Sequence, residues 1–203
     1  GKSHQLYSRI LGASVLPELL IRIDSSGYPF VLVMLVPAAA FLFLGVPVAA
    51  LGCAALAGGL ALFFRDPDRV VPQARGLVVA PADGRVIHAG PADVTTAPDG
   101  EWLQVSVFLS PLDVHVNRTP IGGRVEAVDY RPGRFLPAYR PEAGRENERS
   151  QIRIEDDDHA VIVRQVVGVL ARRVVCRLTP GMKIQRGDRL GIMKFGSRMD
   201  VFL

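Results

Sequence analysis

Residues 28–64, YPFVLVMLVPAAAFLFLGVPVAALGCAALAGGLALFF, contain no charged side chain. The stretch is too long for one membrane span, and Leu44-Gly45-Val46-Pro47 divides it into two arms of about 17–19 residues, or roughly 25–28 Å of helix each. Basic residues flank it on both sides: Lys2, Arg9 and Arg22 before it, and Arg65, Arg69 and Arg75 after it. The positive-inside bias then places both flanks on the cytoplasmic side. We expect a membrane-embedded helical hairpin; a helical pair buried in a soluble protein is the alternative.

The chain before the hairpin, residues 1–27, carries apolar side chains on one helical face: Val15, Leu16, Leu19, Leu20 and Ile23. A short amphipathic helix of this kind is typical of the membrane interface. Packing into a protein core is an equally open interpretation.

The chain after the hairpin, residues 65–203, has the pattern of a β-rich domain. From Gly76 onward, short runs rich in Val and Ile are separated by Gly, Pro and Asp, which predicts strands joined by turns. The expected strands are Leu77–Ala80, Gly84–Ala89, Trp102–Leu109, Gly123–Val128, Gln151–Ile154, Ala160–Val167, Val174–Leu178 and Arg189–Lys194. Because no helical period separates them, we predict a mainly antiparallel sandwich or barrel-like domain, and an α+β protein overall. Arg131–Arg149 lacks either pattern and is a candidate functional loop.

The charge and composition of the chain limit which binding partners we expect. The net charge is +4, but the basic residues are scattered and lack interleaved aromatics, so anionic phospholipid is a better expected partner than nucleic acid. Cys53 and Cys176 are expected to be buried thiols rather than a disulfide. Asp156–His159 predicts a polar hairpin turn, because the four histidines show no ligand spacing; we expect no metal site.

Two places combine residue types that can carry chemistry. Gly196-Ser197 follows an alternating strand; it is either an ordinary turn or a hydroxyl placed beside a strained carbonyl that it can attack. Asp113, His115 and Asn117 alternate along an extended segment, so a polar neighbour can set the protonation of His115.

Other polar segments have structural as well as functional interpretations. Asp83 lies in an Asp-Gly turn, which is usually structural but can also present a catalytic carboxylate. Glu142–Arg149 is either a solvated charged loop or a substrate-binding loop.

Taken in order, these segments resemble the phosphatidylserine decarboxylase family, specifically its short archaeal-type branch. The matching segments are Phe64-Arg65-Asp66-Pro67, Ala82-Asp83-Gly84-Arg85-Val86, Ser110-Pro111-Leu112-Asp113-Val114-His115-Val116-Asn117-Arg118, Gly133-Arg134-Phe135, Glu146-Asn147-Glu148-Arg149 and Phe195-Gly196-Ser197. Each is weak alone, but their order covers nearly all of the chain from Arg65 onward.

The resemblance implies a proenzyme that cuts itself. Ser197 would attack the Gly196 carbonyl, and elimination would leave a large chain, residues 1–196, and a small chain that begins with a pyruvoyl group made from Ser197. The substrate amine would form a Schiff base with this ketone, which then accepts the electrons released with carbon dioxide. The family pattern assigns His115 as the proton donor to the substrate carbon and associates Asp83 with self-cleavage.

One departure leaves the cleavage base open. Longer bacterial members carry a second histidine three positions after the one matched by His115, and here that residue is Arg118. Arginine is not a base at ordinary pH. His88 and His115 itself are the candidates.

The resemblance also implies the substrate, phosphatidylserine, and a site on the cytoplasmic side of the inner membrane that faces the hairpin. The candidates for substrate binding are Arg134, Phe135, Asn147 and Arg149, since a lipid phosphate needs basic or backbone donors. A homodimer is a further possibility.

Three other functions fit parts of the sequence. A lipoyl- or biotin-type carrier would present Lys194 at an exposed hairpin tip. A Ser/Lys protease would use Ser197 and Lys194. A non-catalytic lipid-binding module would explain the hairpin and the charge, but not Gly196-Ser197.

Overall fold

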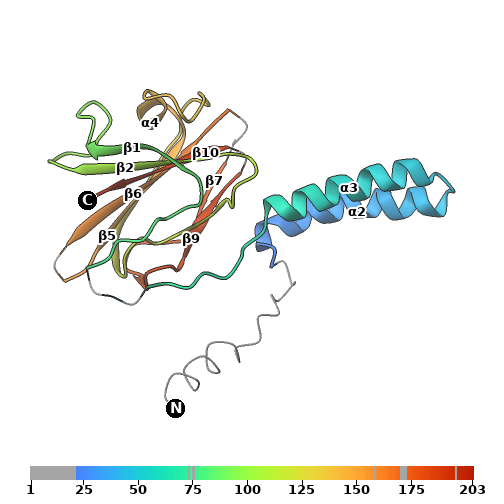
Figure 1. Cartoon of the computed structure of the whole chain (residues 1–203), viewed down its shortest axis with the longest axis horizontal. Coiled ribbons are helices and arrows are strands. Elements are labelled where there is room, and N and C mark those ends of the chain that lie inside the picture. The colour runs from blue at the N-terminus through green and yellow to red at the C-terminus, as the bar shows by residue number, and fades with distance from the viewer. Residues whose placement is uncertain (1–21, 73, 75, 158, 170–172, 195) are drawn as a thin grey trace, which may run out of the picture.

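The computed structural model describes residues 22–72, 74, 76–157, 159–169, 173–194 and 196–203. A two-helix arm projects from a β domain (Figure 1), so the predicted α+β class is confirmed. Most of the helix expected over residues 14–23 lies outside the described residues. Its described end is not helical, because Ile23 instead forms a β-bridge with Arg65.

The arm consists of α2 (Tyr28–Phe43) and α3 (Pro47–Phe63), preceded by the single turn η1 (Ser25–Gly27). Pro29 and Pro47 occupy first-turn positions, where a missing N–H is tolerated. Gly45, with φ 72°, lies in the turn between the helices.

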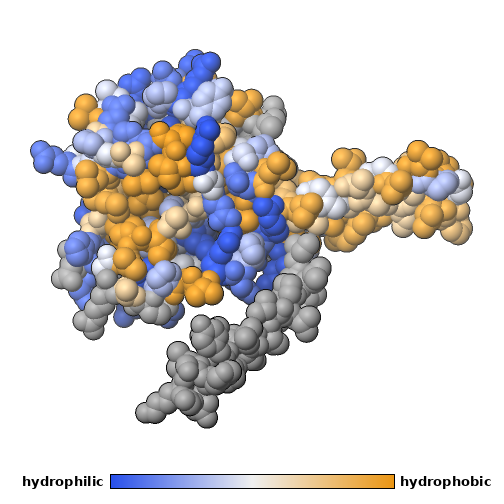
Figure 2. All heavy atoms as spheres, in the orientation of Figure 1, coloured by the Kyte–Doolittle hydropathy of each residue, from blue (hydrophilic) through white to orange (hydrophobic). Residues whose placement is uncertain are grey.

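The arm exposes apolar side chains along its length (Figure 2). By length and composition, Ser25–Phe43 is sufficient to cross a bilayer, and Pro47–Phe63 is apolar but shorter. Exposed apolar surface costs about 25 cal/mol per Å² in water, so the arm is suited to a lipid environment.

The β domain is built from two antiparallel sheets, with no closed barrel. The seven-stranded sheet has the order β1-β2-β10-β6-β5-β4-β8, and the three-stranded sheet has the order β3-β9-β7. The strands are β1 (Arg85–Pro91), β2 (Leu103–Leu109), β3 (Val116–Arg118), β4 (Gly123–Arg131), β5 (Arg149–Glu155), β6 (Ala160–Val167), β7 (Val174–Cys176), β8 (Lys183–Ile184), β9 (Arg189–Met193) and β10 (Ser197–Phe202). One short helix, α4 (Ala143–Glu146), interrupts the loop predicted over Arg131–Arg149.

Two differences from the expected strands matter. Leu77–Ala80 is not a strand; Val79 N–H instead donates to Pro120 O at 3.0 Å. The last residues of the chain form β10, which the sequence analysis did not predict and which pairs with both β2 and β6 near the middle of the large sheet. Ser197 therefore begins a central strand.

Strand alternation decides what β10 presents to each side. Met199 and Val201 join the core between the sheets, whereas Arg198 and Asp200 lie on the outer face. Ser197 has the same parity as Met199 and so points inward. The buried core side chains include Leu109, Val125, Ile152, Ile154, Val163 and Met193.

The arm joins the domain at the small sheet. Phe63 and Phe64 pack on Val114, Val116 and Ile192, so the small sheet lies between the arm and the inner face of the large sheet.

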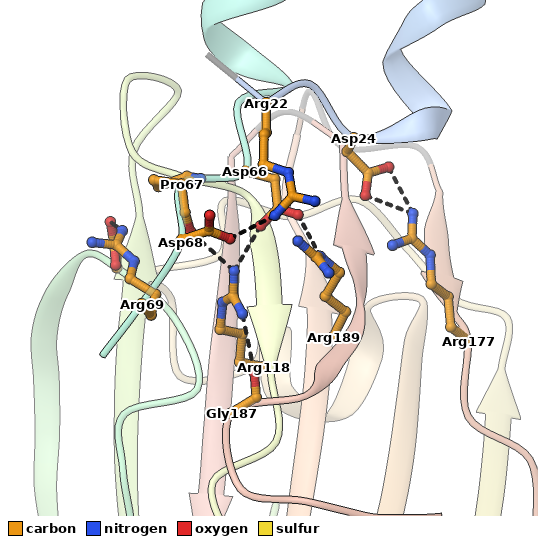
Figure 3. Close-up of polar contacts among 11 residues, drawn as sticks. Arg22, Asp24, Asp66, Pro67, Asp68, Arg69, Arg118, Arg177, Gly187 and Arg189 are labelled. Atoms are coloured by element: carbon orange, nitrogen blue, oxygen red, sulfur yellow. Dashed lines mark hydrogen bonds and ion pairs between the residues drawn. The ribbon is translucent and has the colours of Figure 1, made fainter. Parts of the chain in front are cut away.

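Ion pairs surround this joint (Figure 3). Asp66 is almost fully buried and accepts from both Arg118 and Arg189, and Asp24 accepts two bonds from Arg177 Nη2 at 2.6 and 2.7 Å. Arg118 also donates to Pro67 O and Gly187 O. The arginine at the position of the family's second histidine therefore fastens the arm to the domain.

Candidate active site

Ser197 and Gly196 lie at the entry to β10. Ser197 is fully buried, and its Oγ has no hydrogen-bond partner among the described residues. An unpaired buried hydroxyl costs about 1–3 kcal/mol, so it calls for an explanation beyond stability. Gly196 has φ 69°, in the left-handed region that other residues rarely adopt.

Gly168 makes room for the carbonyl of Gly196. A Cβ at residue 168 would lie 2.4 Å from the Gly196 oxygen and 3.2 Å from its carbonyl carbon. Gly168 directly follows β6, whose last residue, Val167, pairs with Ser197. The end of β6 thus holds the Gly196–Ser197 peptide bond at close range, and only glycine fits there without displacing it.

His115 contacts the other side of Gly196. The Gly196 N–H donates to His115 Nε2 at 3.2 Å, and His115 Nδ1 lies 2.9 Å from the Asp113 carbonyl oxygen. Because a carbonyl only accepts, Nδ1 carries the proton and Nε2 carries the lone pair. Burial lowers the pKa of His115 to about 4, so the ring is neutral at pH 7. His115 is therefore available as a base beside Gly196.

The imidazole also contacts the arm. Its ring centroid lies 4.2 Å from that of Phe63, the last residue of α3. The candidate site therefore lies directly beneath the base of the arm, as expected for a site that faces the hairpin.

Further polar groups lie between the two sheets. Gln165 Nε2 donates to Asn117 Oδ1 at 2.9 Å, and both side chains are fully buried. Gln165 Oε1, Asn117 Nδ2 and Ser150 Oγ have no partner within the described part of the chain. Gln165 is two residues before Val167, so these free donors and acceptors line the interior close to Ser197.

Lys194 brings a positive charge to the same end of the domain. Its Nζ lies 4.8 Å from the ring centroid of Phe30 on α2 and forms no carboxylate ion pair with the described residues. Burial and the charge of Arg173 lower the pKa of this lysine. Lys194 thus links the arm to the strand that leads to Gly196.

The structure places the other candidate polar groups elsewhere. Asp83 is partly exposed, accepts from Arg69 and lines a pocket of about 180 Å³ rather than contacting His115 or Ser197. His88 is exposed on the edge strand β1, with Nε2 3.1 Å from Pro91 O. Of the two histidines considered as the cleavage base, His115 is the one at Gly196.

The four predicted substrate-binding residues are not gathered at Ser197. Arg134 is exposed and pairs with Glu146 at 2.9 Å, and Phe135 is 40% exposed. Asn147 is fully buried; it bonds to both the N–H and the carbonyl of Leu136 and donates to Val167 O, which fastens the loop to the end of β6. Arg149 lies on the outer face of the large sheet, since it pairs with Val166, whereas Ser197 points inward.

The sequence analysis missed two residues of this site. Gln165 had a usable signal, because it occupies an inward position of β6 between Val163 and Val167, where an apolar residue is expected. Gly168 had none, since its role depends on a contact with Gly196 that only the folded chain creates.

The structure thus combines an apolar helical arm with a two-sheet domain, in which a neutral histidine contacts Gly196 and the next residue, Ser197, is buried. The family model of phosphatidylserine decarboxylase matches residues 57–203. The chain is 41% identical over 187 residues to the phosphatidylserine decarboxylase proenzyme of Azorhizobium caulinodans, with 91% of this chain and 80% of the relative covered. It is 42% identical over 187 residues to that of Xanthobacter autotrophicus, with the same shares covered. To that of Symbiobacterium thermophilum it is 43% identical over 186 residues, with 89% and 84% covered. The chain belongs to the phosphatidylserine decarboxylase family.

Proposed function

We propose that this protein cuts its own chain between Gly196 and Ser197 and then decarboxylates phosphatidylserine to phosphatidylethanolamine at a membrane. The observation that carries the proposal is the buried Ser197 hydroxyl, which has no partner among the described residues and follows the closely packed Gly196 carbonyl. Family membership and the proenzyme names of the relatives support it.

Self-cleavage begins with an acyl shift. The Gly196 N–H first releases the lone pair of His115 Nε2. Ser197 Oγ then adds to the Gly196 carbonyl carbon while its proton passes to that nitrogen. The C–N bond then breaks, the nitrogen takes the proton back, and an ester joins Gly196 to Ser197 Oγ. The packing of Gly168 against the carbonyl limits its motion, which favours attack at short range.

Elimination completes the cut. Removal of the Ser197 Cα proton expels the Gly196 carboxylate, and water then replaces the nitrogen, which leaves as ammonia. The products are a large chain, residues 1–196, and a small chain from residue 197 with a pyruvoyl end. Since Ser197 is itself the precursor and its neighbours are small or neutral, the site fits this group.

The pyruvoyl ketone supplies an electrophile for the substrate amine and a sink for the electron pair left by carbon dioxide. The protein must return one proton to the substrate carbon, and we assign this step to His115. A neutral imidazole must first gain that proton at Nε2. The anionic groups of a bound headgroup would favour the protonated ring and raise its pKa.

The lipid reaches the site along the base of the arm. Phe63 contacts both the small sheet and the His115 ring, so a headgroup at the membrane surface needs little displacement. Lys194 Nζ, held over Phe30, is our choice for the headgroup phosphate. The basic flanks of the hairpin support the cytoplasmic side of the inner membrane as the location.

The alternatives fit less well. A carrier needs its lysine at an exposed tip, but Lys194 packs against the arm. A Ser/Lys protease needs a serine that a foreign peptide can reach, and Ser197 is fully buried. A purely lipid-binding module gives no reason for an unpartnered buried hydroxyl.

The experiment is denaturing electrophoresis with a decarboxylation assay on Ser197→Ala. We expect one uncut chain without activity, whereas Ser106→Ala, a buried serine on the outer face of β2, should cut and react normally. Carbon dioxide release by an uncut Ser197→Ala protein would exclude the mechanism.

A further inference from the structure

The outer face of the large sheet carries a pocket that the proposed reaction does not use. It has a volume of about 530 Å³ and is lined by residues 95–99, α4 and the strands β4, β5 and β6. Its charged lining residues are two aspartates and five arginines: Asp99, Asp129, Arg131, Arg145, Arg149, Arg153 and Arg164. The sheet itself separates this arginine pocket from Ser197, which faces inward.

The arginine pocket places like charges in direct opposition. Arg131 and Arg149 are register partners across β4 and β5, an arrangement that destabilises a sheet. Arg164 is 4% exposed, and burial lowers its pKa to about 10; the charge of Asp200 opposes this effect, and the charge of Arg149 adds to it. Folding alone gives no reason to gather these cations.

Two of the arginines have a carboxylate nearby, Asp129 for Arg149 and Asp200 for Arg164, but no direct ion pair with it. Arg131, Arg145 and Arg153 pair with Asp129, Glu146 and Glu155. Arg149 and Arg164 form no carboxylate ion pair with the described residues.

Their observed partners are neutral acceptors. Arg149 donates to two backbone carbonyls, and Arg164 donates to Gln151 Oε1 and to Thr96 O. A polyvalent anion would supply the directly bonded anionic acceptor that both arginines lack.

We propose that the arginine pocket binds a soluble polyvalent phosphate, such as inorganic phosphate, pyrophosphate or a small phosphate monoester. Guanidinium groups recognise phosphate oxygens in a bidentate manner. The lining contains no aromatic side chain to stack on a nucleobase.

The position of the pocket favours a soluble ligand over a lipid headgroup. The arm packs on the small sheet, whereas the pocket opens on the opposite, outer face of the large sheet. In Figure 1, α4 lies at the top of the domain and the arm extends away from it to the right.

The test is calorimetric titration of the full-length protein in neutral detergent with pyrophosphate and with inorganic phosphate. We expect saturable binding that weakens as salt rises. Arg149→Gln should weaken it by about tenfold or more, as loss of a charge-assisted hydrogen bond predicts. Arg131→Gln tests the same prediction independently, and we expect it to fold normally because Arg131 is exposed.

Arg124→Gln is the matched control, because Arg124 is an exposed arginine on β4, the strand that carries Arg131, but does not line the pocket. Absence of saturable binding to the unaltered protein would overturn the proposal, as would binding that neither pocket variant weakens. Binding only to vesicles that contain phosphatidic acid, without binding of the soluble anions, would also overturn it. The measurement does not depend on decarboxylation, so its failure leaves the proposed function untouched.

Discussion

The two faces of the large sheet offer opposite environments to the same strands. On the inner face, Ser197 is buried, its Oγ has no hydrogen-bond partner among the described residues, and the neutral ring of His115 lies next to Gly196. On the outer face, the next residue of β10, Arg198, is held by Asp200, and a row of arginines continues across the neighbouring strands. The contrast teaches that the inner face leaves polar atoms such as Ser197 Oγ without a partner among the described residues, whereas the outer face pairs Arg198 with Asp200.

Gly168→Ala should cause the largest loss of self-cleavage among the changes on the inner face. A methyl group 2.4 Å from the Gly196 oxygen must displace the carbonyl, and misplacement by about 1 Å lowers reactivity roughly 100-fold. We expect almost no self-cleavage by electrophoresis over hours. Gly59→Ala, at a position with nothing within 4 Å, should cut normally; normal cutting of Gly168→Ala would remove the carbonyl packing from the account.

His115→Ala tests the base on the same face. Loss of a positioned base should slow self-cleavage by about 10²–10⁴-fold, measured as the rate of appearance of the small chain. His88→Ala is the control, because that histidine is exposed on β1. If His88→Ala is the slower protein, the assignment of the two histidines is reversed.

Asp200→Asn, on the outer face, should lower the stability of the protein but not its self-cleavage, the reverse of the two preceding variants. Asp200 is fully buried and accepts from Arg198 Nη2 at 3.1 Å, so the change leaves a buried guanidinium unpaired. The free energy of unfolding should fall by about 3–5 kcal/mol in denaturant titrations, while folded protein still cuts itself. Asp129→Asn, in an exposed pair, should cost under about 1 kcal/mol. Equal costs for the two variants would contradict the distinction between them.

The pH dependence of stability gives the smallest effect. In the folded protein His115 has a pKa of about 4, below its ordinary value of 6.5, so the unfolded chain binds more protons between these values. The free energy of unfolding should therefore fall as pH drops from about 6.5 to about 4, by up to roughly 3 kcal/mol. The comparison is with His115→Gln, which should lack this part of the slope; identical slopes would show that the histidine is not buried in its neutral form.

The features of the fold that could be predicted from the sequence are those with a local signal. The hairpin followed from an uncharged run bounded by Asp24 and Arg65, and most strands followed from alternation, because these signals are local. Strand β10 was missed although Ser197, Met199 and Val201 alternate with Arg198 and Asp200. Gly196-Ser197 is a common turn signal, and the strand that begins at Ser197 has only six residues, so the local pattern indicated a turn there.

The site was predictable only in part. Gly196, Ser197 and His115 were identified from motif order, and the structure brings them together. Arg149 was expected to bind substrate, but it lies on the outer face of the sheet. The sequence could not show this, because a residue at the start of a strand can point to either face until the register of the strand is known. The contact between Gly168 and Gly196 joins residues far apart in sequence and depends on the pairing of β6 with β10.

The central claim is that the chain breaks its own backbone at one bond, and intact-mass measurement of the purified protein tests it most directly. We predict two species, residues 1–196 and a fragment from residue 197 whose mass shows a pyruvoyl end that reacts with a carbonyl reagent. A catalytically active preparation that consists of one uncut chain without such a carbonyl would contradict the account.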